Sequence, residues 1–164
     1  GTRLHTCMGC ADHAHAQQDL EGEIERMTHE HYLTAQEAQS LDRRAISRYY
    51  QSDLFLRSQR SNNLRREFAF QMELGREDLE TVIPNIGEHL VTVQGIADIL
   101  LVFPDHLELL DYKTDRGKTE ADFLASYRPQ LNLYAIAVEK RFAPKKVTYK
   151  GIYSFSLGKL IDAN

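Results

Sequence analysis

Cysteine is scarce in this chain, and long hydrophobic runs are missing. The 164 residues include two cysteines, Cys7 and Cys10. Two cysteines cannot build a disulfide framework, which indicates a reducing compartment, the cytoplasm. Their C-x-x-C spacing has no second pair, so neither a zinc site nor an iron–sulfur site is expected. No apolar run approaches the roughly 20 residues that cross a bilayer, and no signal peptide is visible, so no membrane partner is expected.

A strong excess of charge of one sign is also missing. The formal net charge is -4, from 24 acidic and 20 basic residues. This balance argues against a DNA-binding surface over the whole chain, although a local one is still allowed. No nucleophile elbow, phosphate-binding glycine loop or zincin helix is present. The first residue is glycine rather than methionine, which indicates a piece of a longer protein.

What is present predicts one globular domain of 164 residues, with 42% hydrophobic residues to form a core. Residues 1–60 have a helical pattern. Within them, Thr34–Gln51 is predicted as one helix because Thr34 and Glu37 have capping-box spacing and Ala38, Leu41, Ala45 and Tyr49 recur at helical intervals.

Residues 61–164 are predicted to form a sheet core. Phe68, Phe70 and Met72 alternate with polar residues, which is typical of a half-buried strand. Two further strands, 89–103 and 106–114, are separated by Pro104 and Asp105, and a helix over 119–142 and a last strand over 146–157 follow. The order predicts an α/β fold with a mixed sheet flanked by helices.

Two aspartates lie in the apolar runs of the predicted hairpin. If Pro104 and Asp105 form its loop, Phe103 faces His106 and Asp98 lies opposite Asp111. Such residues share a face, with Cα atoms about 4.5–5.5 Å apart. Two carboxylates so placed repel each other unless one is protonated or a cation lies between them. A slip of one residue would separate them. We interpret the pair as a site for a hard cation, Mg²⁺ or Mn²⁺, over the alternative of two unrelated aspartates.

Other candidate residues are weaker taken singly. Lys113 shares a strand face with Asp111, and a surface ion pair is the simpler interpretation of that stretch alone. Gln130 and Tyr134 share one helix face, which core packing would explain equally well. His5 lies at the start of the first helix, where a lone histidine is usually not a ligand. The pairs His13/His15 and His29/His31 are predicted to be surface residues.

In combination these motifs resemble a known family. "GTRLH", "QGIAD", "LLDYKTDR" and "YRPQLNLY" occur in that order and resemble the RecB-type nuclease domain of the PD-(D/E)xK superfamily, in particular its AddA-type branch. The resemblance implies a restriction-endonuclease-like core carrying the QxxxY helix, with an N-terminal helical segment carrying a histidine ligand. It also implies that the chain is part of a larger helicase–nuclease.

The family roles carry over residue by residue. The resemblance implies that His5, Asp98, Asp111 and the Tyr112 carbonyl bind Mg²⁺, for which Mn²⁺ or Ca²⁺ can substitute in binding. It implies that Lys113 acts on the water or the developing charge, and that Gln130 and Tyr134 position the DNA strand. Glu67 is aligned less clearly with a further acidic position.

The implied function is that of a magnesium-dependent DNA exonuclease domain that processes double-strand breaks for recombinational repair in bacteria. Its implied partners are single-stranded DNA fed by the helicase domains of the same parent chain and an AddB-type subunit. One alternative is a catalytically inactive nuclease fold that scans DNA or docks a subunit. Another is a stand-alone exonuclease or restriction-type endonuclease, for which no dimerisation signature is apparent.

Overall fold

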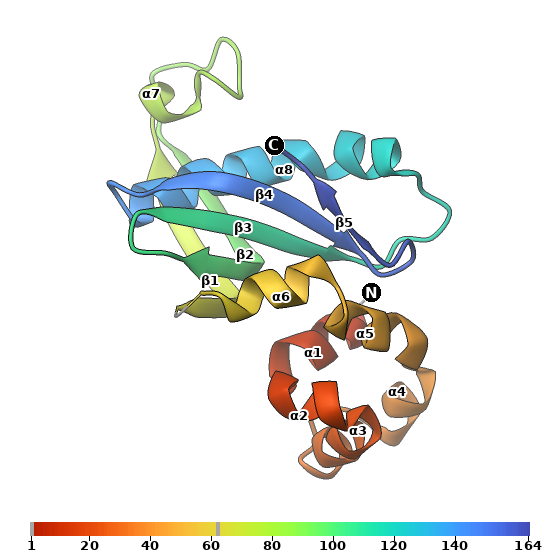
Figure 1. Cartoon of the computed structure of the whole chain (residues 1–164). Coiled ribbons are helices and arrows are strands. Elements are labelled where there is room, and N and C mark those ends of the chain that lie inside the picture. The colour runs from red at the N-terminus through yellow and green to blue at the C-terminus, as the bar shows by residue number, and fades with distance from the viewer. Residues whose placement is uncertain (1, 62) are drawn as a thin grey trace. The chain divides into compact units, whose positions relative to one another are not determined.

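The computed structural model describes residues 2–61 and 63–164 (Figure 1). Its elements follow the order α1 (Thr2–Cys10), α2 (His13–Gln18), α3 (Leu20–His29), α4 (Ala35–Ser40), α5 (Arg43–Tyr50), α6 (Asp53–Gln59), β1 (Leu64–Leu74), α7 (Arg76–Leu79), β2 (Val91–Val102), β3 (His106–Lys113), α8 (Glu120–Arg141), β4 (Lys146–Ser154) and β5 (Lys159–Asp162). None of the described helices is long and apolar enough to span a membrane.

The chain divides into two compact units. The helical unit contains the chain up to Gln59, together with 112–117 and 153–160, and the sheet unit contains 60–111, 118–152 and 161–164. Strand β3 passes from the sheet unit to the helical unit between Asp111 and Tyr112.

The helical unit contains two helices where the sequence predicted one over 34–51. The capping box at Thr34 and Glu37 starts α4 as predicted. Leu41 then adopts an extended conformation with ψ 135°, and Asp42 caps a new helix by accepting a hydrogen bond from the Ala45 backbone N–H. The prediction was wrong because the spacing of apolar residues continues across the break, whereas the backbone bends where Asp42 provides a second cap.

A buried carboxylate joins α2 and α3 within this unit. Glu23 has 1% of its surface exposed. It accepts hydrogen bonds from the Asp12 backbone N–H at 2.7 Å, from His15 Nδ1 at 2.8 Å and from two nitrogens of Arg26 at 2.6 and 3.0 Å. Burial alone would raise the pKa of Glu23, but these bonds outweigh it and lower that pKa to about 2. Glu23 therefore stays ionised at neutral pH.

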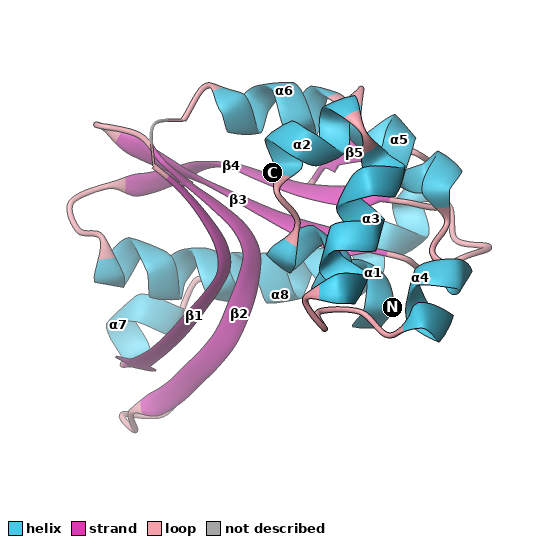
Figure 2. Ribbon diagram, turned by 90° about the horizontal axis from the view of Figure 1, so that it is seen from below, coloured by secondary structure: helices cyan, strands magenta, loops and turns pink. Residues whose placement is uncertain are grey.

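The sheet unit is built on a five-stranded mixed sheet in the order β1-β2-β3-β4-β5. Strands β1, β2 and β3 pair antiparallel as the predicted meander. Helix α8 then returns the chain along the sheet, so that β4 runs in the direction of β3 (Figure 1). Figure 2 shows that β1 and β2 bend together while α8 lies along one face. This is the restriction-endonuclease-like arrangement that the sequence predicted.

The core of the sheet unit lies between the sheet and α8. Leu131, Ala135 and Val138 of α8 pack in one cluster with sheet residues that include the predicted strand residue Phe70. Phe68 and Met72 pack against the cluster, which confirms the predicted alternation along β1. Helix α8 begins at the N-cap Thr119, whose capping box uses Asp122, and continues through Pro129. The sequence analysis did not predict the short helix α7 or the strand β5.

Candidate active site

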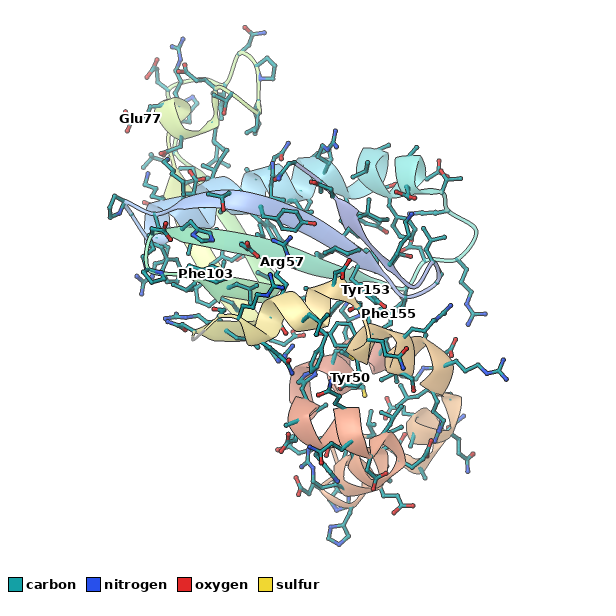
Figure 3. The ribbon with its side chains drawn as sticks, viewed as in Figure 1. Tyr50, Arg57, Glu77, Phe103, Tyr153 and Phe155 are labelled. Carbon is teal, nitrogen blue, oxygen red and sulfur yellow. The ribbon has the colours of Figure 1, made fainter. Side chains whose placement is uncertain are left out.

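The β2–β3 hairpin has the register that the sequence predicted. Ile99 pairs with Leu110 and Val102 with Leu107. The loop closes as predicted, since the Phe103 N–H donates to the His106 carbonyl at 3.0 Å and the two rings stack at 4.4 Å. Phe103 marks this end of the hairpin in Figure 3. The β2–β3 pairs end at Ile99–Leu110; continued by one step, the same register would bring Asp98 opposite Asp111.

Both aspartates are buried, with 7% of Asp98 and 8% of Asp111 exposed. Leu107 and Leu109 of β3 belong to the core beneath α8. Because side chains alternate along a strand, Asp111 lies on this same face. Two carboxylates opposed in a largely apolar setting favour a bound cation, since water screens their repulsion poorly.

A third acidic residue occupies the next strand at the same level. Glu67 lies between the pairs Arg66–Ile99 and Phe68–Ala97, which is the position across from Asp98. Its φ of 48° is left-handed, which is unusual for any residue other than glycine and costs free energy. On β2, the cluster residues Ala97 and Leu100 are three apart, so the alternation of faces is also interrupted there. The two irregular positions lie next to each other on the paired strands, while the register stays the same on both sides of them.

Gln130 and Tyr134 lie on α8, above the same face of the sheet. Gln130 Nε2 donates to the Tyr134 hydroxyl at 3.0 Å. The Tyr134 ring contacts Phe70 edge to face, with centroids 4.8 Å apart. Tyr134 is half-buried and Gln130 is exposed, so the pair presents polar groups to solvent at the edge of the core.

The helical unit brings together two other predicted ligands, His5 and Tyr112. His5 Nε2 lies 3.1 Å from the Tyr112 carbonyl oxygen. A carbonyl only accepts, so this contact needs the Nε2–H tautomer of His5. Two adjacent ligands of an octahedral Mg²⁺, each at about 2.1 Å, also lie about 3 Å apart. The spacing of these atoms therefore fits joint ligation, with the His5 proton moved to Nδ1.

Tyr112 is held by an aromatic cluster within the helical unit. Its hydroxyl lies 2.7 Å from the Tyr49 hydroxyl, and both rings are buried. Figure 3 labels Tyr50, Tyr153 and Phe155 of this cluster, and each lies 5.3–5.8 Å from the Tyr49 ring. The packing fixes the residue whose carbonyl faces His5.

His13 also belongs to this cluster, which corrects its prediction as a surface residue. It is half-buried, and its ring lies 5.7 Å from that of Tyr50. Its Nε2 lies 2.9 Å from the Met8 carbonyl oxygen, and its Nδ1 lies 3.2 Å from the Tyr50 hydroxyl. The sequence spacing of two residues gave no sign of these partners, which come from other helices.

Lys113 ends β3, two residues after Asp111, and is half-buried. Strand alternation puts the two side chains on one face of β3. The Lys113 carbonyl accepts a hydrogen bond from the Phe155 N–H at 2.9 Å, which ties this strand end to the segment after β4. The backbone that carries Lys113 is thus fixed on both sides.

The donor chemistry of these residues suits a hard divalent cation. Asp98 and Asp111 supply opposed carboxylate oxygens, which Mg²⁺ and Mn²⁺ prefer. Within 2–61 and 63–164, no three histidine, cysteine or acidic side chains form a group that could hold a metal ion. The fit of these residues to a divalent cation therefore rests on the two carboxylates. Carbonyl, imidazole or solvent donors would fill the remaining coordination positions of the ion.

Sequence reasoning did not find three of these features. It left Glu67 without a role, because residues 75–90 separate β1 from β2 and the register that places Glu67 across from Asp98 cannot be counted from the sequence. The Tyr49 contact with Tyr112 has no local signal because the residues are 63 apart. The contact between Tyr134 and β2 was signalled only by Gly95, a glycine inside a strand.

Comparisons with known proteins show which proteins this chain resembles in sequence. The chain is 35% identical over 166 residues to a subunit of the ATP-dependent helicase/nuclease of Acetivibrio thermocellus, covering 98% of this chain and 13% of that protein. The identity is 34% over 139 residues with the like-named protein from Ligilactobacillus salivarius, covering 84% and 11%. It is 30% over 171 residues with that of Oceanobacillus iheyensis, covering 99% and 14%.

The chain thus spans 11–14% of the length of these relatives. A family model matches residues 1–159, a range that contains every candidate residue described above. Its description is that of a nuclease, as the opposed carboxylates and the lysine beside them suggest. The chain belongs to the PD-(D/E)XK nuclease superfamily.

Proposed function

We propose that the chain is the metal-dependent deoxyribonuclease module of a bacterial helicase–nuclease, acting as an exonuclease on single strands. The observation that carries this proposal is the burial of Asp98 and Asp111, which the β2–β3 register, continued by one pair, would bring opposite each other. Lys113 lies two residues after Asp111. The names of the relatives support helicase domains elsewhere in the parent chain. We further propose a role in recombinational repair, together with a partner of the AddB type.

The proposed ligands of Mg²⁺ are Asp98, Asp111, His5 and the Tyr112 carbonyl. A divalent cation at such a site neutralises charge on the scissile phosphate and lowers the pKa of a bound water. Burial of the two aspartates keeps their oxygens in place before the ion arrives. Glu67, across from Asp98, adds negative charge that favours a cation further.

Lys113 would act on the substrate side of this site. An ammonium cannot ligate a cation, so its place beside Asp111 suits a role on the attacking water or on developing negative charge. Gln130 and Tyr134 supply amide and hydroxyl groups, which hydrogen-bond phosphate oxygens without reading sequence. Cleavage with little sequence preference follows from this arrangement.

The test compares two aspartates of one hairpin. Asp111→Ala should abolish cleavage of single-stranded DNA in Mg²⁺ or Mn²⁺, because it removes one of the opposed carboxylates. Asp105→Ala, at the exposed loop of the same hairpin, should keep the activity. The Asp111 variant should remain folded, with an unfolding free energy in EDTA equal to or above that of the wild type, since a repulsion is relieved. Both quantities are measured by gel assay and by urea titration.

Metal-dependent cleavage by Asp111→Ala at the wild-type rate would refute the proposed site. A wild-type chain that binds DNA but cleaves none with either metal would instead favour the inactive scanning or docking module.

A further inference from the structure

Gly95 is the one residue of β2 without a side chain. It lies in β2 between Gln94 and Ile96 and pairs with Phe70 of β1. Glycine inside a strand weakens it, because it adds backbone entropy and packs no side chain. Its conformation does not require glycine, since the glycines with positive φ in the described residues are Gly117 and Gly158. The reason for glycine at this position must therefore be space.

That space is taken by Tyr134. A Cβ atom built on Gly95 would lie 2.4 Å from both Cζ and the hydroxyl oxygen of Tyr134, far inside contact distance. On the other side, the Tyr134 ring meets Phe70 edge to face at 4.8 Å. The phenol thus lies directly on the backbone of β2, with Phe70 beside it. The tip of the side chain, not its base, fills the space that glycine leaves.

The contacts of the Tyr134 ring with Gly95 and Phe70 determine the position of the Tyr134 hydroxyl. The hydroxyl accepts from Gln130 Nε2 at 3.0 Å, so moving the ring would move the amide partner as well. Gly95 lies three residues before Asp98 on the same strand. The contact between Tyr134 and Gly95 therefore sets where Gln130 and Tyr134 lie along β2 relative to the buried Asp98.

We propose that Gly95 is a positioning residue for the DNA backbone. Its missing side chain lets the Tyr134 phenol rest on β2 and so fixes the Tyr134 hydroxyl and the Gln130 amide as a rigid pair of phosphate contacts beside the carboxylates. This inference rests on the proposed function and adds to it a residue that touches neither metal nor substrate. Alanine at this position displaces the ring rather than the strand, because a side chain rotates more easily than a paired backbone shifts.

The experiment uses Gly95→Ala, Tyr134→Ala and the double variant of this chain. Dissociation constants for a labelled single strand are measured in Ca²⁺, and kcat and KM in Mn²⁺. Gly95→Ala should weaken DNA binding and raise KM about tenfold, the effect of losing a hydrogen-bonded contact to a charged group. Its kcat and its calorimetric Mn²⁺ affinity should stay within about threefold, since the carboxylates are untouched. Adding Gly95→Ala to Tyr134→Ala should weaken DNA binding no further.

The matched control is Gly75→Ala, whose new Cβ would meet Leu90 at 3.7 Å, an ordinary contact. It should leave DNA binding unchanged. Unchanged DNA binding in Gly95→Ala, or an equal loss in the presence and absence of Tyr134, would overturn the proposal. So would a variant that only unfolds more easily while its KM stays at the wild-type value.

Failure of the proposed function itself is told apart by unfolding free energies measured without DNA. The wild type could neither bind nor cleave DNA while Gly95→Ala destabilises only the chain that retains Tyr134. In that case the contact between Tyr134 and Gly95 exists, but it does not position any group that binds DNA. The proposed function and the role of Gly95 then fall together. If DNA is bound and cleaved and the two substitutions are independent, only the inference about Gly95 fails.

Discussion

At the residue scale, Lys113 offers the sharpest separation of binding from chemistry. Lys113→Ala should cleave about 10²–10³-fold more slowly, the usual effect of removing a preorganised charge from a transition state. Its Mn²⁺ affinity should hold or rise slightly, because a positive charge next to the ion is gone. Calorimetry and a single-strand cleavage assay measure the two effects, with Lys146→Ala, an exposed partner of Glu139, as the control. Joint loss of metal binding and cleavage would make Lys113 a structural partner of Asp111.

The lowered pKa of Glu23 leads us to expect that the stability of the fold decreases in acid. The pKa of Glu23 is lowered to about 2 in the folded chain, against 4.5 for a free glutamate. A depressed carboxyl pKa stabilises the fold above the unfolded value and loses this effect as pH falls through the folded value. Stability should therefore decline from about pH 4.5 towards pH 2. Glu23→Gln should lower the unfolding free energy at pH 7 by about 1–3 kcal/mol.

The check on Glu23 is a series of urea titrations of both proteins from pH 7 to pH 2. The difference between wild type and Glu23→Gln should shrink across the acid range. A constant difference would mean that Glu23 does not carry this acid response.

At the element scale, α8 matters because it carries both Gln130 and Tyr134. Thr119 closes its first turn by accepting from the Asp122 N–H, while Asp122 accepts from the Thr119 N–H and hydroxyl. Thr119→Ala should lower the unfolding free energy by about 1 kcal/mol, and Thr119→Ser should restore it, since serine caps equally well. Urea titration measures both variants. Equal stability of the alanine variant would show that the cap contributes nothing here.

The elements that sequence reasoning found are those fixed by local chemistry. The two-residue loop at Pro104 and Asp105 set the hairpin register, which the pairs Ile99–Leu110 and Val102–Leu107 confirm. The capping box at Thr34 set one helix start. The break at Leu41 escaped because helical periodicity continued across it.

The parts of the site that escaped depend on contacts between distant segments. Tyr49 contacts Tyr112, which is 63 residues away in the sequence. Tyr134 contacts β2 at Gly95, and a single glycine in the sequence does not identify its partner. The left-handed φ of Glu67 follows from strand pairing, which the residue type does not signal. Local sequence signals predict the helices and strands, whereas these contacts form only when the sheet and the helices have come together.

At the scale of the whole molecule, the repulsion between Asp98 and Asp111 links stability to metal. An ion that binds only the folded chain stabilises it by about 2.7 kcal/mol at 100 times its Kd, which raises the Tm of a chain of this length by about 5–10 °C. Thermal unfolding in Mn²⁺ and in EDTA measures the shift. Asp111→Ala should lose most of it, while Asp105→Ala keeps it. Equal shifts in the two variants would place the stabilising ion elsewhere.

The aromatic cluster around Tyr49 has an optical consequence. The chain contains eight tyrosines and no tryptophan, so its near-ultraviolet absorption and emission come almost wholly from phenol rings. The Tyr49 ring lies 5.5 Å from that of Tyr112 and 5.3 Å from that of Tyr153, close enough for the excited states of neighbouring phenols to couple. Because Tyr112 also carries the carbonyl that faces His5, the unlabelled chain contains its own chromophore beside these candidate ligands. If an ion binds there as proposed, its binding should change the near-ultraviolet circular dichroism of the tyrosines.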